Sequence, residues 1–412
     1  MTMLLAVLAG AICTRFEPWL KANAAPASVG AQSTQEKFQG IAVHAPDAFY
    51  DPPAQVPSRP GVLLRSETLR DVMLPAGMQG WRILYTTTID DQTSATAVAT
   101  VFAPARPSAG LRPVITWEHG TAGVLQKCMP SLVSQPTAGI PALDRTVKAD
   151  WVIVATDYSF AEKGGPHSYL VGEGEASAAL DSVRAARQMH ELRLDARTVV
   201  WGHSQGGQAA LWTGIVGPRY APDVKIVGVA AIAPAANMAN ILAMNQAVDK
   251  RLGPYVALSY SRFYPDIKFE QALRPEALPA AREITNRCGF LPTEDPQRIA
   301  ALTATFDGPA LATGTNAALA ARLAQNTADQ PIVAPVVIAQ GLADEVVPPQ
   351  ATDAYVDSRC TAGQRVEYWT FPGRDHSTIV QLGTSLDAPL VTWTSARFAN
   401  KPPPSGCPRM SF

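Results

Sequence analysis

The spacing of apolar residues changes along this chain. Three early segments, residues 61–68, 80–90 and 95–103, read as successive strands, and the last two show the alternating apolar and polar positions typical of a hairpin. From residue 113 onward, short runs rich in Val, Ile and Ala alternate with longer segments of helical pattern. This alternation predicts a mostly parallel sheet with helices on both faces.

The parallel part of the sheet is predicted from a series of short apolar runs. Between the second and third runs, residues 173–192 carry Ala and Leu at helical spacing and predict a helix. The predicted parallel strands are residues 113–117, 151–156, 198–201, 226–233, 336–340 and 366–371.

A long interval separates the fourth of these runs from the fifth. It contains helical patterns, breaks at Gly and Pro, and a group of aromatic residues between Tyr255 and Phe269. An insertion at this point would lie above the carboxyl ends of the strands, where such sheets bind ligands. We therefore expect residues 236–325 to form a helical cap over a core of residues 61–235 and 326–412, with aromatic residues that favour apolar substrates. Helices that merely extend the core are the alternative.

The N-terminal part has a different character. An apolar stretch at residues 3–13 is followed by Ala22-Asn23-Ala24, the small-residue pattern of a signal-peptidase site, although no Lys or Arg precedes the stretch. We expect residues 1–24 to be a signal peptide and the mature protein to be secreted, periplasmic or part of the cell envelope; an ordinary N-terminal helix is the alternative. The stretch is shorter than the roughly 20 residues that span a bilayer, so no stable membrane insertion is expected. Prolines predict an extended arm at residues 25–60.

Composition narrows the class further. The chain has 412 residues, 47% apolar and 17% charged, which is typical of a globular protein with a sizeable core and excludes disorder. The 34 basic and 35 acidic residues nearly cancel, so charge does not favour nucleic acid or an anionic membrane as a partner. The oligomeric state cannot be derived from the sequence.

The cysteines bear on the compartment. Removal of the leader leaves an even number of cysteines, which in an exported protein predicts two disulfides with three possible pairings. Free thiols in a cytosolic protein are the alternative. The cysteines are Cys128, Cys288, Cys360 and Cys407.

One short motif carries the chemistry. Gly202-His203-Ser204-Gln205-Gly206 lies between the apolar run 198–201 and a helical segment. A G-x-S-x-G sequence between a strand and a helix is typical of a nucleophile elbow, a sharp turn that exposes the serine hydroxyl above the sheet. Ser204 is therefore the candidate nucleophile.

A serine hydroxyl needs a base, and usually a carboxylate that orients the base. Of the six histidines, His376 follows the last predicted strand, whereas His203 lies inside the elbow with its side chain expected to point away from Ser204. Asp344 follows the preceding strand, which gives the order serine, acid, histidine expected on such a fold. Glu345 and Asp375 are alternatives for the acid.

An acyl-transfer site also needs two N–H donors for the oxyanion. The backbone N–H of Gln205 is one candidate, and that of Thr121, in the glycine-rich loop after residues 113–117, is the other. His119 is then expected to orient this loop and not to act as the base. Asp157 is a further carboxylate near the strand ends, where we favour a structural role over a catalytic one.

Taken together, these segments resemble the secretory lipase family of α/β hydrolases. The resemblance implies the α/β-hydrolase fold with a helical cap, and hydrolysis of carboxylic esters, including acylglycerols, by Ser204, His376 and Asp344 without a cofactor. It also implies the disulfides Cys128–Cys288 and Cys360–Cys407. His203 stands where tyrosine is frequent in the family. The motifs that carry the resemblance are residues 47–53, 117–121, 155–158, 165–170 and 202–207 and the loops that contain Asp344 and His376.

These observations predict an exported lipase or esterase that acts on small-molecule or lipid esters. An acyltransferase that uses the same acyl-enzyme is one alternative. A binding protein that keeps the fold without activity is another.

Overall fold

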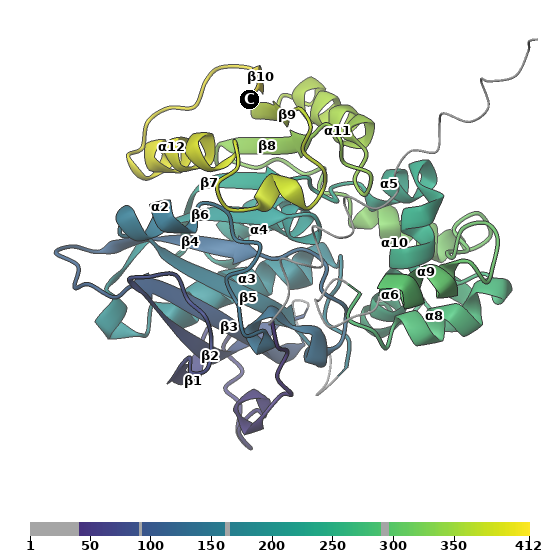
Figure 1. Ribbon diagram of the computed structural model, residues 1–412, viewed down its shortest axis with the longest axis horizontal. Helices are drawn as coiled ribbons and strands as arrows, with labels where there is room; N and C mark the ends of the chain where they lie inside the picture. The colour runs from purple at the N-terminus through teal and green to yellow at the C-terminus, as the bar shows by residue number, and fades with distance from the viewer. Residues whose placement is uncertain (1–40, 90–92, 161–164, 290–295) are drawn as a thin grey trace, which may run out of the picture. The chain divides into compact units, whose positions relative to one another are not determined.

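The computed structural model describes residues 41–89, 93–160, 165–289 and 296–412. The expected signal peptide and the first part of the expected arm lie outside these residues. Within them, the strands form a ten-stranded sheet in the order β1-β2-β3-β5-β4-β6-β7-β8-β9-β10 (Figure 1). The strands are β1 Leu63–Thr68, β2 Met78–Thr88, β3 Ser94–Pro104, β4 Arg112–Glu118, β5 Val152–Ser159, β6 Leu194–His203, β7 Lys225–Ile232, β8 Val336–Gly341, β9 Val366–Phe371 and β10 Arg409–Ser411.

The sheet is mostly parallel, as the sequence predicts. β1, β2, β3 and β5 pair antiparallel in that order, and every pair from β5 to β10 is parallel. Each strand expected from the sequence is present. β10 was not predicted, because its three residues are exposed and carry no apolar pattern. The position of β10 in the sheet is set by its pairing with β9.

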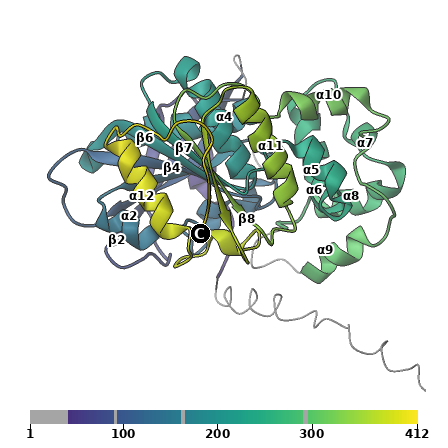
Figure 2. The same cartoon turned by 90° about the horizontal axis from the view of Figure 1, so that it is seen from above.

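Helices cover both faces of the sheet (Figures 1 and 2). On one face α3 Gly172–Ala186, α4 Gln205–Tyr220 and α11 Pro349–Thr361 share an apolar core with Val200 of β6. On the other face α2 Leu143–Lys148 and α12 Asp387–Phe398 share a core with Val199 and Trp201 of the same strand. Strands with apolar residues on both faces therefore read as continuous apolar runs in the sequence.

The predicted helix 173–192 was too long at its C-terminal end. α3 ends at Ala186, and a 3-10 turn, His190–Leu192, follows. Met189 and Leu192 are nevertheless buried in the same core as α3. Their positions kept the helical spacing of apolar residues beyond the point where the helix stops.

The long interval between β7 and β8 is helical. Its helices share an apolar core that also takes in Val124, Tyr169 and Val347, from the loops after β4, β5 and β8. Two of the aromatic residues in this interval, Tyr255 and Tyr260, are fully buried within this core. The helices are α5 Met238–Met244, α6 Gln246–Phe263, α7 Phe269–Ala272, α8 Leu278–Ile284, α9 Pro296–Thr303 and α10 Ala317–Gln325.

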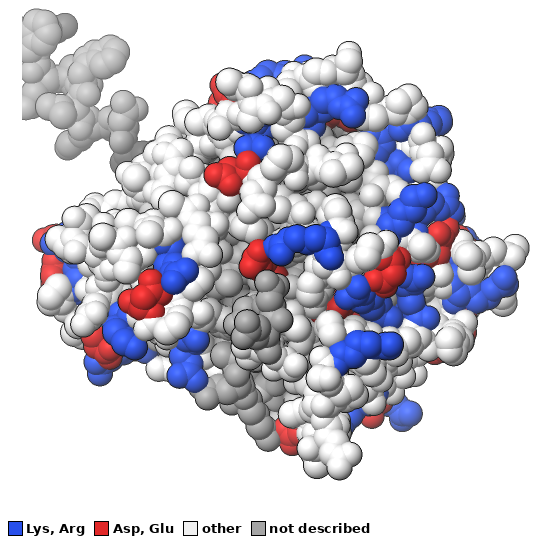
Figure 3. All heavy atoms as spheres, turned by 180° about the vertical axis from the view of Figure 1, so that it is seen from behind, with Lys and Arg blue, Asp and Glu red and all other residues white. Residues whose placement is uncertain are grey.

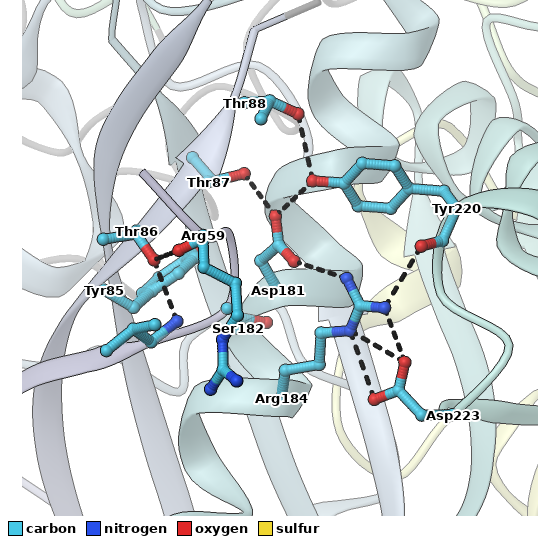
Figure 4. A network of polar contacts seen from close by, with 12 residues as sticks. Arg59, Tyr85, Thr86, Thr87, Thr88, Asp181, Ser182, Arg184, Tyr220 and Asp223 are labelled. Atoms are coloured by element: carbon cyan, nitrogen blue, oxygen red, sulfur yellow. Dashed lines mark hydrogen bonds and ion pairs between the residues drawn. The ribbon is translucent and has the colours of Figure 1, made fainter. Parts of the chain in front are cut away.

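A polar network centred on the buried side chain of Asp181 joins α3 to its neighbours (Figure 4). Asp181 of α3 accepts hydrogen bonds from Thr87 Oγ1 of β2 at 2.9 Å, from the Tyr220 hydroxyl of α4 at 2.6 Å and from Arg184 Nη1 at 3.1 Å. Arg184 also donates to Asp223 from Nε at 3.0 Å. One carboxylate therefore ties together a strand and the two helices that pack on it.

Two disulfides form between the described cysteines, with the pairing that the family resemblance implies. Cys128–Cys288 joins the segment after β4 to the helical insertion, and Cys360–Cys407 joins α11 to the segment before β10. On the face drawn in Figure 3, acidic and basic side chains are interspersed among neutral ones. None of the helices in the described ranges has the length and apolarity needed to cross a bilayer.

Candidate active site

The elbow at Ser204 is a strained turn between β6 and α4. Ser204 has φ 59° and ψ −117°, in a region that non-glycine residues rarely adopt. A Cβ atom on Gly202 would lie 1.9 Å from the carbonyl oxygen of Gly206, and one on Gly206 would lie 1.8 Å from that of Glu118. The turn is therefore possible only with glycine at both positions.

Three side chains meet at this turn from the ends of three strands. His376 Nε2 lies 2.8 Å from Ser204 Oγ, and His376 Nδ1 lies 2.7 Å from Asp344 Oδ2. All three residues are nearly buried, with exposed fractions of 8% for Ser204, 8% for His376 and 4% for Asp344. The geometry lets the serine hydroxyl donate to the imidazole while the other ring N–H donates to the carboxylate.

Asp344 is the carboxylate that reaches His376. Its Oδ1 accepts hydrogen bonds from the backbone N–H of Val346 and of Val347, both at 2.8 Å, which fixes the side chain. Glu345 is exposed, and so is Asp375, whose Oδ1 accepts from the N–H groups of the turn that follows it. Asp344, and neither alternative acid, is the carboxylate hydrogen-bonded to His376 among the described residues.

His203 makes a contact that the sequence did not predict. Its Nε2–H donates to the backbone carbonyl of His376 at 2.8 Å, and the two imidazole rings lie 4.7 Å apart. Burial, with a contribution from His376, lowers the pKa of His203 to about 3, so the ring is neutral near neutral pH. His203 therefore contacts the candidate base directly, and the effect of this position extends beyond packing beside the serine.

His119 does not contact Ser204. Its Nδ1–H donates to the carbonyl oxygen of Gly120 at 2.7 Å, and burial lowers its pKa to about 4. Gly120, the next residue, lies against the elbow, because a Cβ atom on it would lie 3.4 Å from Ser204 Cβ. Its neighbour Thr121 bonds through Oγ1 to the Tyr169 hydroxyl at 2.9 Å.

The two candidate oxyanion donors lie on these two loops. Gln205 is the first residue of α4, where backbone N–H groups have no acceptor within the helix and carry the positive end of the helix dipole. The backbone N–H groups of Gln205 and Thr121 have no hydrogen-bond partner among the residues that the structure describes. Both are free to bind an anion.

Asp157 has a structural environment. Its carboxylate accepts hydrogen bonds from the backbone N–H of Ser131, at 3.2 Å, and from the hydroxyl of the same residue. Burial raises its pKa to about 7. The contacts hold the 3-10 turn Pro130–Leu132 against β5, in line with the role favoured from the sequence.

Two side chains near the serine make contacts that the sequence does not predict. His203 is recognisable only as part of the motif, and Glu175, whose carboxyl contacts the Gln205 side chain, lies in no motif. Their partners are distant in sequence, so no local signal marks them. Within the described ranges, no cluster of His, Cys, Asp and Glu side chains is arranged to hold a metal ion.

The fold and the elbow define an α/β hydrolase. The sequence profile of the secretory lipase family matches residues 137–406, and the chain belongs to this family of carboxylic ester hydrolases. Family membership and the two disulfides fit an extracellular protein.

Individual relatives agree with this assignment. Lipase A of Moesziomyces aphidis is 24% identical over 394 residues, which cover 87% of this chain and 82% of the relative. A probable inactive lipase of Mycobacterium tuberculosis is 24% identical over 382 residues, with 86% and 82% covered. The crystal structure of Candida antarctica lipase A in its closed state superposes with a TM-score of 0.67 and 20% identity, covering 88% of this chain and 90% of that one.

Proposed function

We propose that the protein is a secreted lipase or esterase that cleaves apolar carboxylic esters, such as acylglycerols, through an acyl-enzyme on Ser204. The observation that carries the proposal is the hydrogen-bonded series Ser204–His376–Asp344 at a strained elbow. The secretory lipase family, to which the chain belongs, supports the class of substrate. The predicted signal peptide at residues 1–24 supports export.

The proposed catalytic cycle uses these side chains in turn. Ser204 Oγ attacks the ester carbonyl while His376 Nε2 takes its proton, and Asp344 stabilises the imidazolium that forms. The N–H groups of Gln205 and Thr121 bind the oxyanion of the tetrahedral intermediate. His376 then gives the proton to the leaving alcohol, and a water molecule activated by the same base releases the acid.

The helical insertion of residues 236–325 is the proposed cap. Its apolar core includes side chains from the loops after β4 and β8, which also carry Thr121 and Asp344. A segment that packs on these loops is in a position to shape the acyl pocket. Rates over acyl esters of increasing chain length would define that pocket.

A non-catalytic protein is the competing proposal, because one relative is described as a probable inactive lipase. The proposed roles give the present chain a nucleophile, a base, an acid and two N–H donors. A protein that only binds a ligand does not require that combination, so we favour catalysis.

The test is replacement of the nucleophile. Ser204→Ala should reduce hydrolysis of a short-chain nitrophenyl ester by roughly a millionfold, as expected when a triad serine is removed. A fluorophosphonate should label the wild-type protein and not this variant, while Ser395→Ala, at an exposed position on α12, should keep full activity. Turnover by Ser204→Ala, or absence of label on the wild-type protein, would refute the proposal.

A further inference from the structure

A buried carboxyl that the catalytic cycle does not use lies directly behind the elbow. Glu175, in the first turn of α3, is fully buried. Its Oε1 accepts hydrogen bonds from the side-chain amide of Gln205, at 2.6 Å, and from the backbone N–H of Leu170, at 3.0 Å. Gln205 is the residue after the candidate nucleophile, so this contact reaches the oxyanion side of the site.

The remaining oxygens of this pair indicate where a proton lies. Glu175 Oε2 and Gln205 Oε1 are both buried and have no hydrogen-bond partner among the described groups. An ionised carboxylate and an amide oxygen are both acceptors, so neither can satisfy the other. A protonated carboxyl supplies the missing donor: its O–H donates to Gln205 Oε1 while Gln205 Nε2 donates to Oε1. The two side chains then form a reciprocal acid–amide pair with no unsatisfied atom.

The charges around Glu175 favour the same state. The titratable groups that face it are Glu118 of β4, Tyr158 of β5, Tyr169 of the following loop and Tyr260 of α6, and none of these is a cation. Burial raises the pKa of Glu118 well above its usual range, and Glu118 offers no positive charge to an ionised Glu175 in either protonation state. Burial likewise raises the pKa of Glu175 to about 8.

Residues 169 and 170 link Glu175 to the loop that carries Thr121. Leu170 donates its N–H to Glu175, and its neighbour Tyr169 bonds to Thr121 Oγ1 at 2.9 Å. The helical insertion contributes as well, because the Tyr260 hydroxyl donates to the Leu170 carbonyl at 3.1 Å. The acid–amide pair is therefore part of a rigid connection between the two N–H donors and α6.

We propose that Glu175 is a positioning residue, which as a neutral carboxylic acid pairs with the Gln205 side chain and fixes the first turn of α4. In this arrangement the Gln205 backbone N–H stays aimed at the oxyanion. The inference rests on the proposed function, because the position of Gln205 matters only if Ser204 is the nucleophile.

Two variants distinguish the effect of the hydrogen-bonded pair with Gln205 from the effect of a charge on Glu175. Glu175→Ala removes the pair and should lower kcat roughly tenfold to a hundredfold, less than full loss of an oxyanion donor, with KM little changed. Glu175→Gln can form the same two hydrogen bonds with Gln205 and should restore most of kcat. Glu173→Gln is the matched control, since Glu173 is exposed on the same helical turn and pairs with Arg219.

The pH dependence supplies a readout that packing alone would not change. In the wild-type protein kcat should fall as the pH rises through about 8, because ionised Glu175 loses its hydrogen bond to Gln205 Oε1. Glu175→Gln has no proton to lose there, so its kcat should not show this fall. The difference between the two profiles isolates Glu175 from Glu118 and the base.

Thermal stability tests the same proton independently. The folded protein holds it up to about pH 8, whereas the unfolded chain releases it near the ordinary value of 4.5. The wild-type protein should therefore lose melting temperature relative to Glu175→Gln as the pH rises from about 4.5 to 8, with a constant difference above that. This comparison stands even if Glu175→Ala does not fold.

Two results would overturn the inference. One is a Glu175→Gln variant as impaired as Glu175→Ala, which would mean that the ionised carboxylate is the working form. The other is a set of kcat and melting profiles for Glu175→Gln that are parallel to those of the wild-type protein. If Ser204→Ala also keeps activity, the proposed function itself has failed; if it is inactive, only the role of Glu175 is refuted.

Discussion

At the scale of single residues, the site combines side chains that the sequence marks with side chains that it does not. The proximity of Ser204, Asp344 and His376 could be predicted because each lies in the turn or loop that leaves a strand, and parallel strands bring their carboxyl ends to one edge. His203 and Glu175 could not be assigned a contact. His203 meets the His376 carbonyl 173 residues away, and Glu175 meets Gln205 30 residues away.

His203 gives the prediction at this scale. His203→Phe keeps a ring of similar size but removes the N–H that holds the His376 backbone, so kcat should fall roughly tenfold, the effect of about one lost hydrogen bond. His203→Gln can place an amide N–H near the same carbonyl and should recover part of the loss. Steady-state kinetics on a nitrophenyl ester measures both. Equal kcat for His203→Phe and the wild-type protein would show that the contact does not position the base.

At the scale of secondary structure, the apolar runs predicted the presence of strands better than they predicted where helices end. Runs buried on both faces identified the strands from β4 to β9, whereas β10 was missed because its place depends on pairing with β9. The end of α3 was also missed, since Met189 and Leu192 pack on the core from a turn as they would from a helix. The apolar pattern therefore indicated which residues are buried. It did not indicate the backbone conformation of those residues.

Asp181 gives the prediction for the contact of α3 with β2 and α4. Burial raises its pKa from an ordinary 3.8 to about 6, so the folded protein binds the proton more tightly than the unfolded chain. Its contribution to the free energy of unfolding therefore falls as the pH rises from about 4 to 6, by up to roughly 3 kcal/mol, and is constant above. Asp181→Asn removes this titration.

Melting temperatures at pH 4, 5, 6 and 7, taken at roughly one-unit steps across this window, test the prediction. The melting temperature of the wild-type protein should fall relative to that of Asp181→Asn as the pH rises to 6. Above pH 6 the difference between the two melting temperatures should stay constant. Asp223→Asn changes an exposed partner of the same Arg184 and should follow the wild-type profile. Parallel profiles for Asp181→Asn and the wild-type protein would contradict the assignment.

At the scale of the whole molecule, two disulfides join parts that are distant in sequence. Cys128–Cys288 spans 160 residues and joins the segment after β4 to the insertion, while Cys360–Cys407 spans 47 residues near β10. Both pairs are expected to form in an oxidising compartment. The first disulfide packs against the loop that carries Thr121, because a Cβ atom on Gly123 would lie 2.8 Å from Cys128 Sγ.

Removal of each disulfide is therefore expected to have a different effect on stability and on kcat. Cys360→Ala with Cys407→Ala should cost about 2–4 kcal/mol of stability and leave kcat at 25 °C unchanged. Cys128→Ala with Cys288→Ala should cost at least as much, since the closed loop is longer, and should also lower kcat by loosening the segment behind Thr121. Denaturant unfolding and ester hydrolysis measure the two effects. Equal kcat values for the two double variants would refute a role of Cys128–Cys288 at the site.

The sequence alone determined the class of fold, the position of the elbow and the order of its partners. It could do so because these properties depend on local patterns: apolar runs, two glycines around a serine, and residues just after strands. The tertiary structure decided which carboxylate reaches His376, where His203 points and what Glu175 contacts. It also placed Tyr255 and Tyr260 in the core of the insertion. These properties depend on close approaches between distant segments, which packing sets and local sequence does not encode.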